Sequence, residues 1–161
     1  MTTLAAIERE VRAMAAHIRA DADLLPTFGR TRDSAYPHIE VNEAGMHWVV
    51  VERGQELERA TFQDLGGLLE RVLNSITFSM ALAWELRHRR AGQDNRRLMF
   101  ARQLELLRDL SPLWAEREMV AQAETLARHP YDDASEARVR LTTRLRRAGQ
   151  SDEEAWRNAC A

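Results

Sequence analysis

The sequence predicts an α+β fold, in which a small antiparallel β-sheet at about residues 38–60 packs against a predominantly α-helical bundle. One window of the chain alternates apolar and polar residues with the period of two that is typical of a half-buried strand. On both sides of it, apolar residues recur every three or four positions, as they do in amphipathic helices. The 161 residues suit a single domain that can bury a core.

The first helix is expected at residues 3–24, because its apolar residues step by three and four. Thr2 or Thr3 can cap its N-terminus. Pro26 disfavours the α conformation at the residue before it and should end the helix there. The following residues, 26–36, are rich in Pro, Gly, Ser and charge, so we expect a loop.

A β-hairpin is expected next, with its turn at residues 42–45. The return strand, 46–52, contains three consecutive valines, which we expect to be covered on both faces. Gly54 should end this strand, and the residues after it suggest a short third strand.

Five helices should follow and pack over the sheet, at residues 62–91, 95–110, 112–128, 133–148 and 152–159. The first of them has an apolar stripe seven turns long, which marks it as the central helix, and Thr61 is its expected cap. Ser111 followed by Pro112 is a strong helix start, and Ser151 with Glu154 forms a capping box.

Composition excludes several classes of function. The formal net charge is −2, which provides no electrostatic footprint for nucleic acid. All 23 basic residues are arginine, which a GC-rich genome explains better than anion recognition does. The single cysteine, Cys160, excludes an internal disulfide. Because the sequence shows no signal peptide and no apolar run of the ~20 residues that span a bilayer, we expect a cytoplasmic protein without a membrane partner.

No catalytic or metal-binding constellation is assembled in the sequence. Glu85 and His88 form one E-x-x-H pair, whereas di-iron helical bundles need two such pairs and two further glutamates. The serines lie in no G-x-S-x-G setting. We therefore expect no enzyme activity, no metal and no cofactor.

Charged residues crowd the hairpin exit and the end of the central helix, and they are expected to form a structural ion network between sheet and helix. Its candidate members are Glu52, Arg53, Glu56, Arg59, Glu85, Arg89, Asp94, Arg96 and Arg97. Glu85 and Arg89 are spaced i, i+4 with the acid first, which is the better order for a helical ion pair. One or two of these charges can instead reach a partner.

Several short motifs resemble a family of bacterial polymorphic-toxin immunity proteins, the immunity protein 63 family. They are PHIEV and HWVVVERG in the hairpin, ATFQDL at the start of the central helix, TFSMALAWEL within it, and then QDNRRLMF, LELL and HPYDD. The glycines Gly66 and Gly67 depart from the acidic residues of the family at that turn. The resemblance implies one immunity-type domain that binds and neutralises a toxin domain encoded by an adjacent gene. A non-catalytic regulatory or scaffold module remains the alternative.

The surface that contacts the partner is expected on the loop before the hairpin and on the exposed side of the hairpin, because loops on a rigid scaffold often carry recognition. The candidate residues are Phe28, Arg30, Arg32, Tyr36, His38, Glu40 and His47. The sequence leaves open whether the chain forms homo-oligomers.

Overall fold

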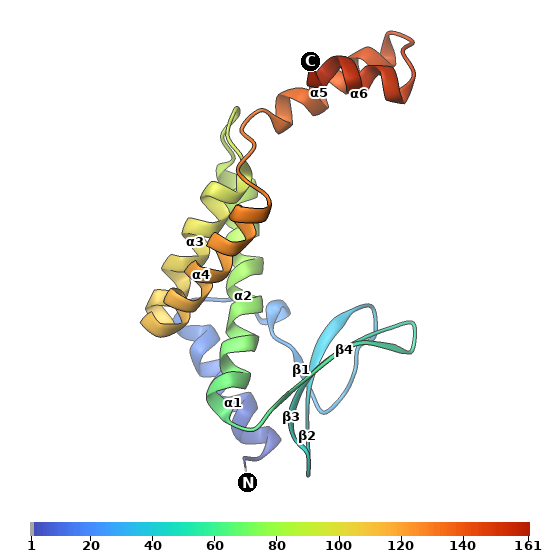
Figure 1. The fold of residues 1–161 in the computed structure, drawn as a ribbon. Coiled ribbons are helices and arrows are strands. Elements are labelled where there is room, and N and C mark those ends of the chain that lie inside the picture. The colour runs from blue at the N-terminus through green and yellow to red at the C-terminus, as the bar shows by residue number, and fades with distance from the viewer. Residues whose placement is uncertain (1) are drawn as a thin grey trace.

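A computed structural model describes residues 2–161 and confirms the α+β class. The elements in chain order are α1 (Leu4–His17), η1 (Ala22–Leu24), β1 (Thr27–Phe28), β2 (Tyr36–Asn42), β3 (Gly45–Glu52), β4 (Gln55–Phe62), α2 (Leu65–His88), α3 (Asn95–Leu110), α4 (Pro112–Arg128), α5 (Ser135–Arg147) and α6 (Asp152–Cys160). A four-stranded sheet lies beside the lower half of the long helix α2, α3 and α4 run alongside this helix, and α5 and α6 project from its upper end (Figure 1).

The first helix ends earlier than the sequence predicts. It stops at His17, because Arg19 adopts a left-handed conformation with a φ of 57°. Leu25 is extended, as the following Pro26 requires, so the proline acts on the short 3₁₀ turn and not on α1.

The sheet has the strand order β1-β2-β3-β4 and is mixed, not wholly antiparallel as expected. Strands β2, β3 and β4 form antiparallel ladders, whereas the two residues of β1 pair with β2 in parallel. β1 lies in the segment that was expected to be only loop, and it is too short to produce a periodic signal. Strand β4 corresponds to the short strand that was expected after Gly54. It has eight residues and is longer than expected.

The β2–β3 turn explains Gly45. This residue has a φ of +133°, and a Cβ there would lie 2.7 Å from the carbonyl oxygen of Phe62. The Asn42 side chain accepts a hydrogen bond from the Ala44 amide at 2.8 Å, which closes the turn. Another residue at Gly45 would therefore push β4 away.

The cap of α2 is Asp64, not Thr61. The Asp64 carboxylate accepts a hydrogen bond from the Gly67 amide at 2.8 Å, while Thr61 belongs to β4. Gly66 and Gly67 lie in the first turn, where an added Cβ would come 3.2 Å from the Asp64 carboxylate and 3.3 Å from the Phe62 ring, respectively. The glycines therefore fit around the cap and the adjacent phenylalanine.

Helices α1 and α2 cover one face of the sheet and form the core with it. The buried core residues include Ile7 and Val11 of α1, Ile39 and Trp48 of the sheet, and Leu68, Val72, Leu73 and Ile76 of α2. The Arg71 guanidinium stacks 4.5 Å from the Trp48 ring centroid and pairs with Glu58, which closes this side of the sheet. Helix α3 packs against α2, and α4 packs against α3.

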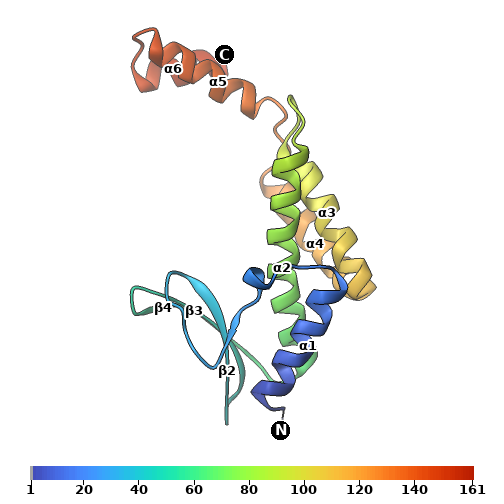
Figure 2. The ribbon, with the colours of Figure 1, turned by 180° about the vertical axis from the view of Figure 1, so that it is seen from behind.

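Of the helices that were expected to pack over the sheet, α2 does so, whereas α3 packs on α2 and α4 on α3. α5 and α6 pack on each other and project from the upper end of the helical bundle (Figures 1 and 2). In both views they extend to the same side of α2 as the sheet does. We call residues 135–160 the C-terminal arm. None of the helices within residues 2–161 is long and apolar enough to cross a membrane.

Candidate partner-binding surface

The face of the sheet that points away from α1 and α2, here called the outer face, carries rows of mostly polar side chains. Two rows cross β2, β3 and β4: Glu40, His47 and Thr61, then His38, Val49 and Arg59. The outer face therefore brings together several of the residues that the sequence singles out.

His38 and His47 were expected to be exposed to a partner, and this expectation is wrong. Each histidine is only 3% exposed. His47 Nδ1 lies 2.9 Å from Thr61 Oγ1 and its Nε2 lies 2.8 Å from Asn42 Oδ1. His38 Nε2 lies 2.9 Å from Glu40 Oε1. Side chains of the same and neighbouring strands thus enclose both rings in a polar layer that alternation alone does not reveal.

Arg59 joins Glu40 to Glu56 on the outer face. Its NH1 donates to Glu40 Oε2 at 2.9 Å, and its Nε and NH2 donate to the two Glu56 oxygens at 2.9 and 2.7 Å. Hydrogen bonds from His38 and Arg59 hold the pKa of Glu40 below its ordinary value, and Arg59 lowers the pKa of Glu56 likewise. Both carboxylates are therefore ionised at neutral pH, and both accept hydrogen bonds from Arg59.

A strained loop lies at one end of the sheet. Asp33, Ser34 and Ala35 have φ values of 57°, 58° and 56°, a left-handed conformation that costs an L-residue roughly 1–2 kcal/mol. The Asp33 side chain accepts from the Gly54 amide at 3.4 Å, and the Ala35 amide donates to the Val51 carbonyl at 2.9 Å. These bonds tie the loop to the end of β3 and to the β3–β4 turn. We call residues 29–35 and 52–55 the sheet tip.

The two aromatic candidates near the sheet tip, Phe28 and Tyr36, both make contacts within the fold. The Tyr36 hydroxyl lies 2.6 Å from the carbonyl oxygens of both Asp23 and Leu25, and Phe28 packs against the core. Arg32 stacks on the Tyr36 ring at 4.2 Å. Arg30 and Arg32 are exposed and line a polar pocket of about 320 Å³ beside α1. They are the exposed members of the expected partner-binding set, with Glu40 half-buried.

A second charged cluster, centred on Asp94, joins the start of α3 to the end of α4. The Asp94 carboxylate accepts from the Arg96 side chain and from the Asp132 amide, the latter at 2.8 Å. Arg96 also donates to the carbonyl oxygens of His129 and Pro130, both at 2.8 Å. The hydrogen bonds from Arg96 and then from the Asp132 amide hold the pKa of Asp94 far below its ordinary value.

Arg97 completes this junction. Its Nε and NH2 bond the two Asp133 oxygens at 2.9 and 3.0 Å, and Asp133 in turn accepts from the Asp94 amide at 2.8 Å. The Arg97 guanidinium also lies 4.0 Å from the centre of the Tyr131 ring. The role of Tyr131 and Asp133 was not predicted, although the HPYDD motif provided a signal for it.

Glu85 and Arg89 form a third, separate pair on α2. The Arg89 Nε and NH2 each donate to one Glu85 oxygen at 2.8 Å. The Glu85 side chain is 0% exposed, while that of Arg89 is 45% exposed. Arg89 lowers the pKa of Glu85, so a buried carboxylate stays ionised at the end of the helix.

The charged residues therefore form three clusters and not the single network that was expected. One is on the outer face, one at Glu85–Arg89, and one around Asp94. Glu52 and Arg53 make no ion pair with any residue between 2 and 161. Glu52 is the last residue of β3, and Arg53 lies in the following turn with a φ of 53°. Their position next to the hairpin in the sequence therefore did not predict an ion pair.

The sequence also missed an exposed apolar stripe on the C-terminal half of α2. Phe78, Leu82 and Leu86 are spaced by four residues and are 42%, 37% and 59% exposed. Phe78 and Leu86 are among the apolar residues that give the central helix its expected seven-turn stripe, so their exposure differs from that expectation. The helix has 24 residues and runs beyond the sheet, so its far end has no sheet to cover it.

His88 packs against Trp84 one turn earlier on α2. Its ring stacks on Trp84 with centroids 4.2 Å apart, and its Nδ1 lies 2.8 Å from the Trp84 carbonyl oxygen. Among residues 2–161, no three His, Cys, Asp or Glu side chains come together in a way that could hold a metal ion.

Comparison with models of protein families finds a match to this chain. The model of the family described as Immunity protein 63 matches residues 42–124, which is more than half of the chain. This range runs from the last residue of β2 into α4. It contains the Glu85–Arg89 pair entirely and the other two charged clusters in part. No curated protein and no solved structure matches the chain significantly.

Proposed function

The chain belongs to the Immunity protein 63 family, and from this we propose that it binds a cognate toxin domain and neutralises it in a stoichiometric complex. The family match carries the proposal. We further propose that the toxin is encoded by the adjacent gene, that the protein acts in the cytoplasm, and that it blocks the toxin by binding and not by catalysis.

The geometry supports a binding role. Within each of the three clusters, the charged side chains pair with one another and hold the sheet or the helices in position. Such a scaffold presents loops in fixed conformations, which reduces the entropy lost on binding.

We propose the sheet tip, with its exposed arginines Arg30 and Arg32, as the surface that contacts the toxin. The left-handed residues 33–35 support this choice, since backbone strain concentrates at functional sites. Arg30 and Arg32 add two exposed guanidinium groups, which are common anchors in protein interfaces. His38 and His47 would act behind this surface, by holding the strands that present it.

The test is co-expression of the chain with the neighbouring toxin. We expect the wild-type chain to restore growth and to co-purify with the toxin domain in a fixed ratio. An Arg30→Glu, Arg32→Glu variant should protect less well. The matched control, Arg108→Glu, Arg117→Glu, changes the net charge equally at exposed positions of α3 and α4 outside the sheet tip and should protect like the wild type.

A non-catalytic regulatory or scaffold module is the second candidate, and the exposed stripe of Phe78, Leu82 and Leu86 favours it, because exposed apolar groups in a row mark protein contacts. If the wild-type chain neither restores growth nor co-purifies with the toxin, the immunity function fails and this candidate replaces it.

A further inference from the structure

The C-terminal arm differs in charge from the rest of the chain. Residues 135–161 contain six arginines and four acidic residues, a net charge of +2. Residues 1–134 contain 17 arginines and 21 acidic residues, a net charge of −4. The chain therefore carries a basic projection on an acidic body.

Part of this positive charge is not compensated within the arm or its neighbours. Arg138, Arg140 and Arg146 pair with Asp132, Glu136 and Asp152, respectively. Arg144 and Arg147 make no ion pair with any residue in the range 2–161 that the structure describes. Both lie in the last turn of α5, where they complement the helix dipole, but a dipole leaves the guanidinium donors free for a ligand.

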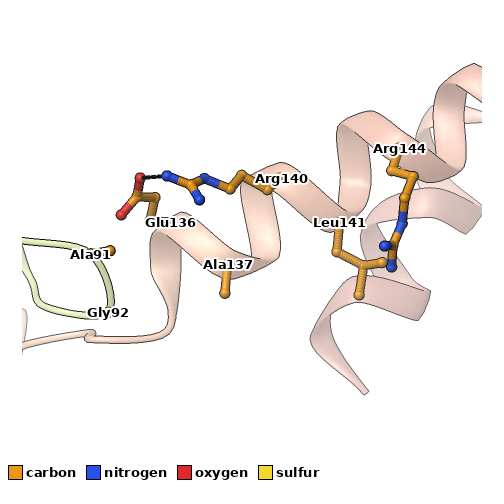
Figure 3. Close-up of a pocket in the computed structure, with 7 residues that line it drawn as sticks. All are labelled: Ala91, Gly92, Glu136, Ala137, Arg140, Leu141 and Arg144. Carbon is orange, nitrogen blue, oxygen red and sulfur yellow. Dashed lines mark hydrogen bonds and ion pairs between the residues drawn. The ribbon is translucent and has the colours of Figure 1, made fainter.

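A pocket of about 420 Å³ lies where the arm leaves the bundle (Figure 3). The α2–α3 connection contributes Ala91 and Gly92, and α5 contributes Glu136, Ala137, Arg140, Leu141 and Arg144. Ala137, Leu141 and Arg144 extend to the same side of α5, while Arg140 turns toward Glu136. The pocket thus combines a short apolar floor with one unpaired guanidinium.

We propose that this pocket receives an acidic side chain, aspartate or glutamate, from the toxin domain, and that the arm is a second contact which selects the toxin. This inference rests on the proposed function. A guanidinium binds a carboxylate with two parallel hydrogen bonds, and the apolar floor accommodates the methylene groups of an acidic side chain. The family match ends at residue 124, so the arm lies outside the matched region and suits a role in partner choice.

The chemistry of the arm favours a protein partner over nucleic acid. The whole chain is acidic, with a net charge of −2, and would repel a polyanion at long range. The arm also exposes Val139 and Trp156, which match an apolar protein surface. An acidic patch with apolar neighbours on the toxin domain is therefore the surface that fits.

The test measures the Kd between the full chain and the purified toxin domain encoded next to it. An Arg144→Gln, Arg147→Gln variant should bind at least about thirtyfold more weakly and with a smaller dependence on salt. Ala137→Phe, which fills the pocket without changing charge, should also weaken binding by about tenfold or more. Arg9→Gln, Arg108→Gln is the charge-matched control and should bind within about twofold of the wild type. Circular dichroism checks that each variant keeps its helices.

Wild-type-like affinity of either arm variant overturns the inference while leaving the proposed function intact. If the wild type itself does not bind the toxin, both fail together. A DNA duplex of ~20 base pairs serves as a second probe, and we expect no measurable binding at physiological salt. Duplex binding that is lost in the arginine variant, with toxin affinity unchanged, would assign the arm to nucleic acid and also overturn the inference.

Discussion

Arg89 reaches back one helical turn and holds the carboxylate of Glu85 with two hydrogen bonds of 2.8 Å each. The carboxylate is fully buried, whereas the guanidinium is partly in water. The buried negative charge of Glu85 is therefore compensated by the guanidinium of Arg89, which lies at the surface.

Arg89→Ala should lower the free energy of unfolding, because it leaves a buried carboxylate without its partner. An unsatisfied buried group costs about 1–3 kcal/mol, and the exposed side of Arg89 suggests that water relieves part of the larger loss seen for fully buried pairs. Urea denaturation followed by circular dichroism measures this. Glu85→Gln, Arg89→Gln removes both charges and should recover part of the stability. An Arg89→Ala variant that melts like the wild type but no longer binds the toxin would make the pair an interface.

The Asp94 junction predicts a loss of stability in acid. Arg96 and the Asp132 amide lower the pKa of Asp94 in the folded protein, so its contribution is complete above the unfolded pKa of about 3.9. That contribution is lost as the pH falls below about 4 toward the lower folded pKa. The pKa values of Glu40 and Glu85 are also lowered, and their contributions decrease over the same acidic range.

Asp94→Asn isolates this contribution. The substitution removes the charge that Arg96 binds and should cost about 1.5–3 kcal/mol at pH 7, the range for hydrogen bonds to charged groups. Between pH 7 and pH 3, the free energy of unfolding obtained from urea denaturation should depend less steeply on pH in the variant than in the wild type. Faster hydrogen exchange at the Asp132 amide would locate the effect. Equal pH profiles would show that other carboxylates control acid unfolding.

Local sequence signals predicted much of the fold. The helices after α2 begin and end within two residues of their expected bounds, because Ser111-Pro112 and the Ser151–Glu154 capping box are explicit signals. The hairpin followed from alternation and a turn. In contrast, nothing local distinguishes Thr61 in a strand from Thr61 as a cap, since its bond to His47 spans 14 residues.

The candidate surface was less predictable, because exposure depends on tertiary packing. His38 and His47 lie at polar positions of an alternating pattern, yet their neighbours enclose them. Leu86 continues an apolar stripe, yet α2 extends past the elements that would cover it. The arm projects because α5 packs on α6 and not on the helical bundle. The apolar pattern of α5 could not predict this, since the helix contains no fully buried residue.

Ala35→Gly should stabilise the protein. Ala35 has a φ of 56°, where glycine avoids a cost of roughly 1–2 kcal/mol but loses about 0.5–1 kcal/mol through the entropy of the unfolded chain. We expect a net gain of about 0.5–1 kcal/mol in thermal denaturation. Ala44→Gly, at a turn residue without a positive φ, should give no gain. Destabilisation by Ala35→Gly would show that the left-handed turn is not strained.

The same variant tests the sheet tip as a binding surface. A more flexible loop loses more entropy on forming the complex, so Ala35→Gly should weaken toxin binding while it stabilises the free protein. Calorimetric titration with the toxin domain measures this opposition. Equal or tighter binding would separate the loop conformation from recognition.

The exposed stripe on α2 predicts that Leu86 contributes little to stability. Leu86→Gln replaces a 59% exposed residue with a good helix former, so the free energy of unfolding should change by less than about 1 kcal/mol. Ile76→Ala, ten residues earlier on the buried face, should cost about 2–5 kcal/mol. Urea denaturation of the two variants provides the comparison. A loss at Leu86 as large as that at Ile76 would mean that the arm or a second copy covers the stripe in solution, since burial is what makes an apolar side chain stabilising.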